Sequence, residues 1–174
     1  CIRDRWYTKQ TTEFSSYIAV ILGNPDSSYF KSEFIQEMAH IRSHFPNNPL
    51  FFCGSPRMHQ LTKEKVLAVM QNQDKIWLDE SDGPNPYQSL LRSAYKLCVS
   101  ADSINMISES CQSQAPVSIL AKSMTPSAKH QKFIQSIQAR LCALDAVIVG
   151  KPVDYALDQI MQHRLIHSIL GESP

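Results

Sequence analysis

The stretch KLCVSADSINMISES, residues 96–110, decides the fold class. Its first five residues form an apolar run typical of a buried strand, and residues 104–113 repeat apolar side chains at helical spacing. Small polar residues connect the two segments. A buried strand that leads through a short polar turn into a helix is the repeating unit of α/β folds.

The order of strand and helix recurs along almost the whole sequence. We expect strands at 17–22, 50–55, 75–79, 96–100, 116–121 and 146–150. We expect helices at 30–45, 61–71, 87–95, 104–113, 128–141 and 155–170. Parallel strands need long crossover connections, which cover both faces of their sheet. The pattern therefore predicts an α/β fold: a doubly wound, six-stranded, mostly parallel sheet with helices on both faces.

Length sets the domain organisation. The chain has 174 residues, about one domain's worth of material with a sizeable core. We expect a Rossmann-like domain over residues 17–174 and an arm or linker over residues 1–16. The sequence begins at Cys1 without an initiator Met, so we expect it to be a fragment of a longer protein.

Charge and cysteine content exclude several classes of partner. The 17 basic and 16 acidic residues are interspersed and give a net charge of +1, which argues against a nucleic-acid partner. No apolar run approaches the roughly 20 residues of a membrane-spanning helix, so we expect no transmembrane segment and leave open a peripheral membrane contact. The 5 cysteines have no C-x-x-C spacing, which predicts buried, reduced thiols and a cytoplasmic location.

The polar turn within 96–110 is a candidate phosphate site. Ligands of open parallel sheets bind beyond the carboxyl ends of the strands, where helix N-termini offer unpaired N–H groups. Ser100, Ala101, Asp102 and Ser103 are small enough to let a phosphate approach the backbone. Asp102 or Ser103 would equally suit the N-cap of the helix, where a carboxylate would compete with a phosphate. Both interpretations stay open.

Glu109 follows on the same predicted helix. Its carboxylate is suited to accept hydrogen bonds from the vicinal hydroxyls of a ribose, as acidic residues do in nucleotide-binding domains. The spacing is equally compatible with a solvated side chain. Together, phosphate at the helix start and ribose at Glu109 would indicate a nucleoside diphosphate.

Several cationic residues also fall near predicted carboxyl ends of strands. Lys122, Lys129 and Lys132, together with His130, form the densest basic segment. Such a segment is usually a solvated face, and the functional alternative places Lys129 or Lys132 near a phosphate. Arg57, in the turn after the second strand, is a further candidate.

Two histidine pairs have the i, i+4 spacing that can present two imidazoles on one helix face. They are His40 with His44 and His163 with His167. Neither pair has a third ligand at a spacing typical of a metal-binding family, and H-E-x-x-H is absent, so the sequence predicts no metal site.

Nucleophilic and dinucleotide motifs are also missing from the sequence. It contains no G-x-S-x-G elbow, no G-x-x-x-x-G-K-S/T loop and no G-x-G-x-x-G fingerprint. Cys53 and Cys98 lie within predicted strands, where apolar burial raises thiol pKa values, so we expect core residues there. Neither an ATPase nor an ordinary dinucleotide oxidoreductase is indicated.

Residues 77–120 closely resemble the C-terminal half of the mitochondrial-fission "elongated mitochondria" family. Bacterial members of that family are described as nucleoside-diphosphate-sugar-binding proteins or glycosyltransferases. The resemblance runs from about residue 17 to the end and is most specific in SADSINMISE (100–109). Matching turns are ILGNPDSSYF (21–30), CGSPRM (53–58), SAKHQKF (127–133) and the element formed by Gly83, Asn85, Pro86 and Tyr87. One departure is Gly23-Asn24-Pro25 where many relatives read Gly-Gly-Pro.

The resemblance implies a GT-B-like protein with two Rossmann-like domains, of which this chain is the second. In such proteins the C-terminal domain holds the nucleotide-sugar donor, and the resemblance assigns Ser103, Ser108 and Glu109 to its phosphate and ribose. The expected nucleotide-binding set is completed by Gly23, Asn24, Ser55, Arg57, Ser100 and Asp102. Expected contacts with the donor phosphate or sugar are Asn85, Tyr87, Lys129 and Lys132.

The function implied is donor binding for a metal-independent glycosyltransferase, with a nucleoside-diphosphate sugar as substrate and no cofactor. Helix-terminal N–H groups and nearby cations would stabilise the pyrophosphate leaving group. The domain would be inactive without the N-terminal domain, its expected partner. Two alternatives stay open: a non-catalytic adaptor of the mitochondrial-fission type, and a sugar-nucleotide epimerase.

Overall fold

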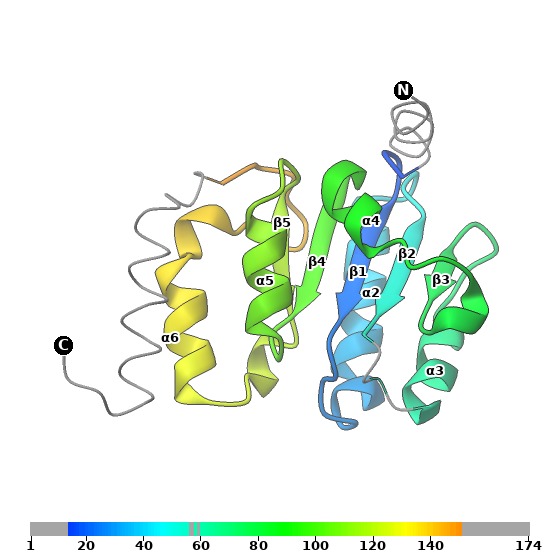
Figure 1. Cartoon of the computed structure of the whole chain (residues 1–174), viewed down its shortest axis with the longest axis horizontal. Helices are drawn as coiled ribbons and strands as arrows, with labels where there is room; N and C mark the ends of the chain where they lie inside the picture. Colours follow the sequence, from blue (N-terminus) through cyan, green and yellow to red (C-terminus); the bar gives the residue numbers. More distant parts are fainter. Residues whose placement is uncertain (1–13, 56–57, 59, 151–174) are drawn as a thin grey trace.

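The computed structural model describes residues 14–55, 58 and 60–150, which form an α/β domain built on a parallel sheet (Figure 1). Its strands are β1 (Ile18–Leu22), β2 (Leu50–Gly54), β3 (Lys75–Trp77), β4 (Lys96–Ser100) and β5 (Val117–Leu120). Its α-helices are α2 (Glu33–His44), α3 (Gln60–Leu67), α4 (Tyr87–Ser93), α5 (Ile104–Cys111) and α6 (Ala128–Ser136). Short 3₁₀ turns are η1 (Tyr29–Lys31), η2 (Glu80–Asp82), η3 (Lys122–Met124) and η4 (Gln138–Arg140).

The strand order is β3-β2-β1-β4-β5, and every paired strand runs parallel to its neighbour. After β1 the chain turns outward through α2 to β2 and β3, and it later returns through α4 to β4 on the other side of β1. The strand order therefore reverses between β1 and β4. Ligands of doubly wound sheets bind in the crevice at this switch point, beyond the carboxyl ends of the strands.

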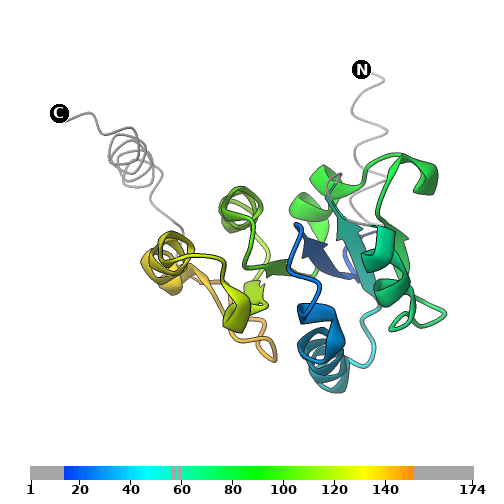
Figure 2. The ribbon, with the colours of Figure 1, turned by 90° about the horizontal axis from the view of Figure 1, so that it is seen from below.

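Helices lie on both faces of the sheet (Figure 2), and an apolar layer fills the space between the sheet and the helices on each face. Side chains of α2, η1 and α3 pack on one face, together with alternate residues of β1 such as Ile18 and Val20. Side chains of α4, α5 and α6 pack on the other face, with Ala19 and Ile21. All five residues of β1 are fully buried, which explains why its sequence is a continuous apolar run. The predicted doubly wound α/β class is confirmed.

The predicted sixth strand at 146–150 is wrong. Within the described chain the sheet has five strands, and Val147, Ile148 and Val149 are 42%, 70% and 54% exposed. The chain touches the edge of β5 through a single bridge between Val117 and Leu141. It then leaves the sheet. Lys96 of β4 and Ser118 of β5 donate side-chain hydrogen bonds to carbonyls within residues 142–146, and these bonds take the place of backbone hydrogen bonds to β5.

Several predicted boundaries also move. Strand β3 ends at Trp77 because the Asp82 carboxylate accepts the N–H of Leu78, which closes a capped turn. The helix predicted at 128–141 ends as α6 at Ser136 and continues as η4. The helix predicted at 155–170 lies outside the described residues, as does the His163 and His167 pair.

Phe14, in the predicted arm, packs its ring on Phe51 of β2 with centroids 5.5 Å apart. In the part of the chain that the structure describes, no helix is both long and apolar enough to cross a bilayer. The four described cysteines form no disulfide: Cys53, Cys98 and Cys111 are buried, and Cys142 is half-buried. Burial raises the pKa of both Cys53 and Cys98 to about 12, consistent with their predicted place in the core.

Candidate functional site at the switch point

The loops that follow β1 and β4 are hydrogen-bonded to each other at the switch point. The N–H of Gly23 donates to the Ser100 hydroxyl at 2.9 Å, and the N–H of Asn24 donates to Asp102 Oδ2 at 2.6 Å. Ser100 is fully buried, so its hydroxyl satisfies a backbone donor that water does not reach. Four residues of the predicted nucleotide-binding set are thus brought together, although they stand far apart in the sequence.

The loop after β1 requires a glycine at position 23 because the loop after β4 lies so close to it, and not because of the backbone conformation of Gly23. A Cβ atom at Gly23 would lie 2.4 Å from Asp102 Oδ2 and 3.0 Å from the Cβ of Ser103. Among the described residues, positive φ angles occur at Ala121 and Gly83, so neither Gly23 nor Asn24 adopts one. Asn24 therefore fits the turn without strain, although the family resemblance led us to expect a second glycine there.

The structure shows which of the two candidate residues caps α5. Ser103 is the N-cap, and its hydroxyl accepts the N–H of Met106 at 3.5 Å. Asp102 instead holds the β1 loop through Oδ2, while its buried Oδ1 has no partner among the residues described here. A buried acceptor is stabilised by a hydrogen-bond donor. Asp102 therefore favours a hydroxyl or N–H group of a ligand over an anionic oxygen at this point.

Ser55 connects the end of β2 to the loop after β1. Its hydroxyl donates to the Gly23 carbonyl at 2.7 Å, so the loop after β2 is joined to the loop after β1. Arg57, predicted next to it, lies outside the described residues.

His130 brings the start of α6 to the switch point. Its Nε2 lies 3.2 Å from the Asp102 carbonyl oxygen, and its Nδ1 lies 2.8 Å from the Ser127 hydroxyl. A carbonyl only accepts, so Nε2 carries the proton and Nδ1 accepts from Ser127. Lys129 and Lys132 are exposed on the same helix. The sequence identified His130 only as part of a basic segment, since no local spacing relates it to Asp102.

A second group of predicted residues lies between α4 and α5. The Tyr87 hydroxyl donates to Glu109 Oε2 at 2.6 Å, and the Asn85 side-chain oxygen accepts the N–H of Tyr87 at 2.9 Å. Burial, and then the neighbouring Glu109 carboxylate, raise the pKa of the Tyr87 phenol above its ordinary value. Glu109 is exposed yet oriented by Tyr87, and Ser108 precedes it on α5 as a half-buried residue. Glu109 is therefore positioned by a partner that the sequence did not indicate.

A family model described as mitochondrial fission ELM1 matches residues 2–154, so the chain belongs to that family. No curated protein matches the sequence significantly. The match spans the switch point, the Tyr87 and Glu109 pair and the start of α6.

Proposed function

Starting from membership of the mitochondrial fission ELM1 family, we propose that this chain is the donor-binding domain of a GT-B-like glycosyltransferase. The proposed ligand is a nucleoside diphosphate sugar, bound across the carboxyl edge of the sheet and over α5. The proposed location is cytoplasmic, and four described cysteines that form no disulfide, three of them buried, support it.

The observation that carries the proposal is the pairing of Tyr87 with Glu109. The hydroxyl of Tyr87 donates a hydrogen bond to Oε2 of Glu109 at 2.6 Å, which orients the carboxylate. The other oxygen, Oε1, would accept a hydrogen bond from a ribose hydroxyl. α5 begins at the switch point, so its first N–H groups and Glu109 lie on one helix. This arrangement suits a ligand with an anionic part at one end and vicinal hydroxyls at the other.

The residues around this helix have distinct proposed roles. Lys129, exposed in the first turn of α6, would contribute positive charge to a diphosphate, with Lys132 one turn further along. Asp102 Oδ1, buried and without a partner among the described residues, would accept a donor group of the nucleotide. Developing charge on a diphosphate leaving group would be stabilised by backbone N–H groups and these lysines.

The test is a calorimetric titration of the chain with UDP, GDP, ADP, CMP and TDP, repeated on two variants. Glu109→Ala should weaken binding of the preferred nucleotide tenfold or more, which corresponds to about 1.4 kcal/mol. Glu64→Ala removes an exposed carboxylate of α3 and should leave the affinity unchanged. An affinity equal in Glu109→Ala and the unmodified chain would contradict the role of Glu109.

A second candidate function is a non-catalytic adaptor. The observation that favours it is the closed hydrogen bonding at the switch point, where Ser100 and Asp102 already bind the N–H groups of Gly23 and Asn24. Because these backbone N–H groups already have acceptors within the chain, the two loops need no ligand to satisfy them. If no nucleotide binds at millimolar concentration, the adaptor becomes the better proposal.

A further inference from the structure

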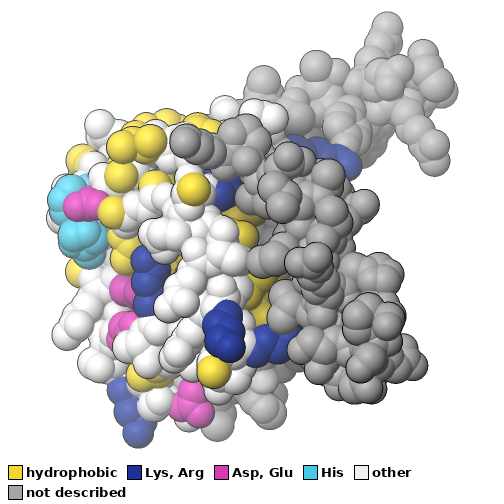
Figure 3. All heavy atoms as spheres, turned by 90° about the vertical axis from the view of Figure 1, so that its left-hand side faces the viewer, with side chains coloured by type: hydrophobic (Ala, Val, Ile, Leu, Met, Phe, Trp, Pro, Cys, Tyr) yellow, Lys and Arg dark blue, Asp and Glu magenta, His cyan; other side chains and the backbone are white. Residues whose placement is uncertain are grey.

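Three exposed side chains that can ligate a metal meet where the C-terminal end of α2 faces the loop after η4. They are His40, His44 and Asp145, and one ligand atom from each lies within 4.8 Å of the other two. Figure 3 shows histidine side chains beside an acidic side chain on the molecular surface. Asp145 thus supplies the third ligand that the i, i+4 histidine spacing lacks in its own part of the sequence.

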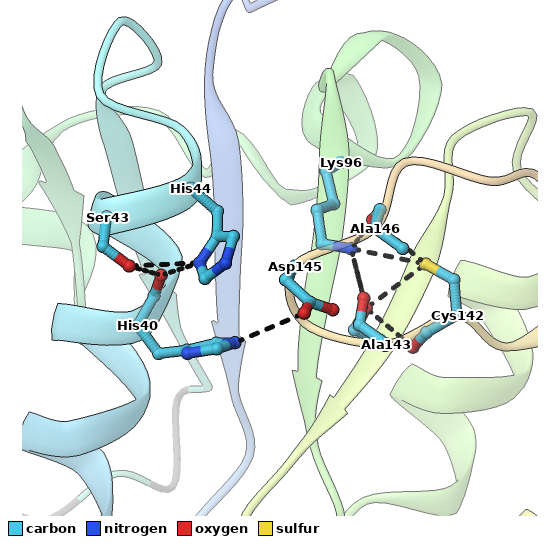
Figure 4. Close-up of polar contacts among 9 residues, drawn as sticks. His40, Ser43, His44, Lys96, Cys142, Ala143, Asp145 and Ala146 are labelled. Atoms are coloured by element: carbon cyan, nitrogen blue, oxygen red, sulfur yellow. Dashed lines mark hydrogen bonds and ion pairs between the residues drawn. The ribbon is translucent and has the colours of Figure 1, made fainter.

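The backbone of α2 selects the ligating nitrogen of His44. His44 Nδ1 lies 3.0 Å from the His40 carbonyl oxygen. A carbonyl only accepts, so Nδ1 of neutral His44 carries the proton and Nε2 keeps its lone pair. Figure 4 shows that second nitrogen on the side of the ring that faces Asp145. Metal-bound histidines usually donate their other N–H to an oxygen in this way.

Asp145 sits on a turn that a buried lysine holds in place (Figure 4). Lys96 is fully buried in β4, and its ammonium group donates to the carbonyls of Ala143, at 3.0 Å, and Ala146. The N–H of Ala146 also donates to the Ala143 carbonyl at 3.1 Å. Both ends of the turn are therefore anchored to the sheet, and the Asp145 backbone is positioned before any ligand binds.

An ion pair alone does not account for this arrangement. His40 Nε2 lies 3.9 Å from Asp145 Oδ2, with both side chains more than two-fifths exposed, and such pairs contribute little to stability. The pair also leaves His44 unexplained, although the rings of His40 and His44 stand only 4.5 Å apart. Two neighbouring imidazoles and a carboxylate can each donate an electron pair to one and the same cation.

We propose that His40, His44 and Asp145 bind one divalent transition-metal ion of the zinc class. Two imidazole nitrogens and one carboxylate oxygen are ligands typical of zinc, with a fourth position open to water. Bonds of about 2.0–2.2 Å place tetrahedral ligand atoms roughly 3.4 Å apart, so small rotations of these exposed side chains close the site. The bound ion connects α2 to the loop of residues 142–146.

The experiment titrates the chelator-treated chain with Co²⁺, followed by absorbance, and with Zn²⁺, followed by calorimetry. One equivalent of each ion should bind, and Mg²⁺, which prefers oxygen ligands, should not. Asp145→Asn and His44→Gln should each weaken binding by more than tenfold, since loss of an outer partner alone costs roughly 10- to 100-fold. Amide exchange of residues 143–147 should slow on adding Zn²⁺ to the unmodified chain, and it should slow less at the same Zn²⁺ concentration in Asp145→Asn and His44→Gln.

The matched control replaces the other histidine pair of identical spacing, His163 and His167, by glutamine. Binding should persist in this double variant. The proposal is overturned if binding disappears there and survives in Asp145→Asn, or if neither ion binds at millimolar concentration. It is also overturned if the Co²⁺ spectrum shows the charge-transfer absorption of a thiolate ligand, which would place the ion on a cysteine.

Discussion

The N–H of Gly23 donates to the buried hydroxyl of Ser100 at 2.9 Å, across the boundary between β1 and β4. This bond closes the point where the strand order of the sheet reverses, and the Asn24 to Asp102 bond lies beside it. The loops that would receive a ligand are therefore held in position by the chain itself. Pre-positioned loops reduce the ordering cost of binding.

Ser100→Ala should lower the free energy of unfolding by about 1–3 kcal/mol, because the buried N–H of Gly23 loses its acceptor. Urea denaturation measures this loss. The matched control is Ser110→Ala on α5: Ser110 is equally buried, and its hydroxyl has no partner within the described part of the chain. Removing that hydroxyl should be neutral or stabilising, and equal losses in both variants would contradict the assigned bond.

Gly23→Ala should destabilise the fold by about 1–3 kcal/mol through overpacking, since the new Cβ would meet Asp102 Oδ2. The clash predicts coupling between the two positions. In Asp102→Ala the oxygen is gone, so adding Gly23→Ala should cost clearly less than it does alone. A double-mutant cycle from denaturation curves measures this difference, and strictly additive effects would show that the carboxylate is not the obstacle.

Lys96→Met should lower the free energy of unfolding by about 2–3 kcal/mol, because the Ala143 and Ala146 carbonyls lose a charged donor, the fully buried Lys96. Faster amide exchange should appear in residues 141–147. Lys65→Met, at an exposed position of α3, should change stability by less than about 0.5 kcal/mol. Unchanged exchange in Lys96→Met would mean that the loop is held by other contacts.

Tyr29 should make the fold sensitive to alkali. Its fully buried hydroxyl donates to Glu37 Oε2 at 2.6 Å, and burial, followed by the Glu37 carboxylate, raises the pKa of the phenol. Above about pH 10 the unfolded chain releases the phenolic proton while the folded chain retains it. The unfolded state then binds fewer protons, so stability, fully present at lower pH, falls as the pH rises.

Tyr29 should contribute about 1.4 kcal/mol per pH unit to the slope while its phenol stays protonated in the folded chain. Tyr87, Cys53 and Cys98, whose pKa values are also raised, add their own contributions. Denaturation curves from about pH 9 to 11.5 measure it. Tyr29→Phe should reduce the slope by about that contribution, whereas Tyr95→Phe, at a ring that is 40% exposed, should leave it unchanged. A profile that Tyr29→Phe leaves unchanged would refute the assignment.

Local sequence predicted the elements well where burial and period agree. The run KLCVS became β4 with every residue buried, and the polar turn after it led into α5 as expected. AVIVG has the same apolar character, yet Ile148 is 70% exposed and the segment forms no strand. A segment becomes a strand only when a neighbouring strand forms backbone hydrogen bonds with it. At this edge of the sheet the side chains of Lys96 and Ser118 instead donate hydrogen bonds to the carbonyl of Ala143.

The sequence by itself determined the α/β class, the order of strands and helices and the residue types gathered at the carboxyl edge, because propensity and hydrophobic period are local properties. Only the tertiary structure decided which distant residues contact one another. Gly23 and Ser100 are separated by 77 positions, Asn24 and Asp102 by 78, and no spacing rule connects Asp145 with His44. Such contacts depend on strand order and packing, which bring distant segments to one edge and fix which polar groups meet there.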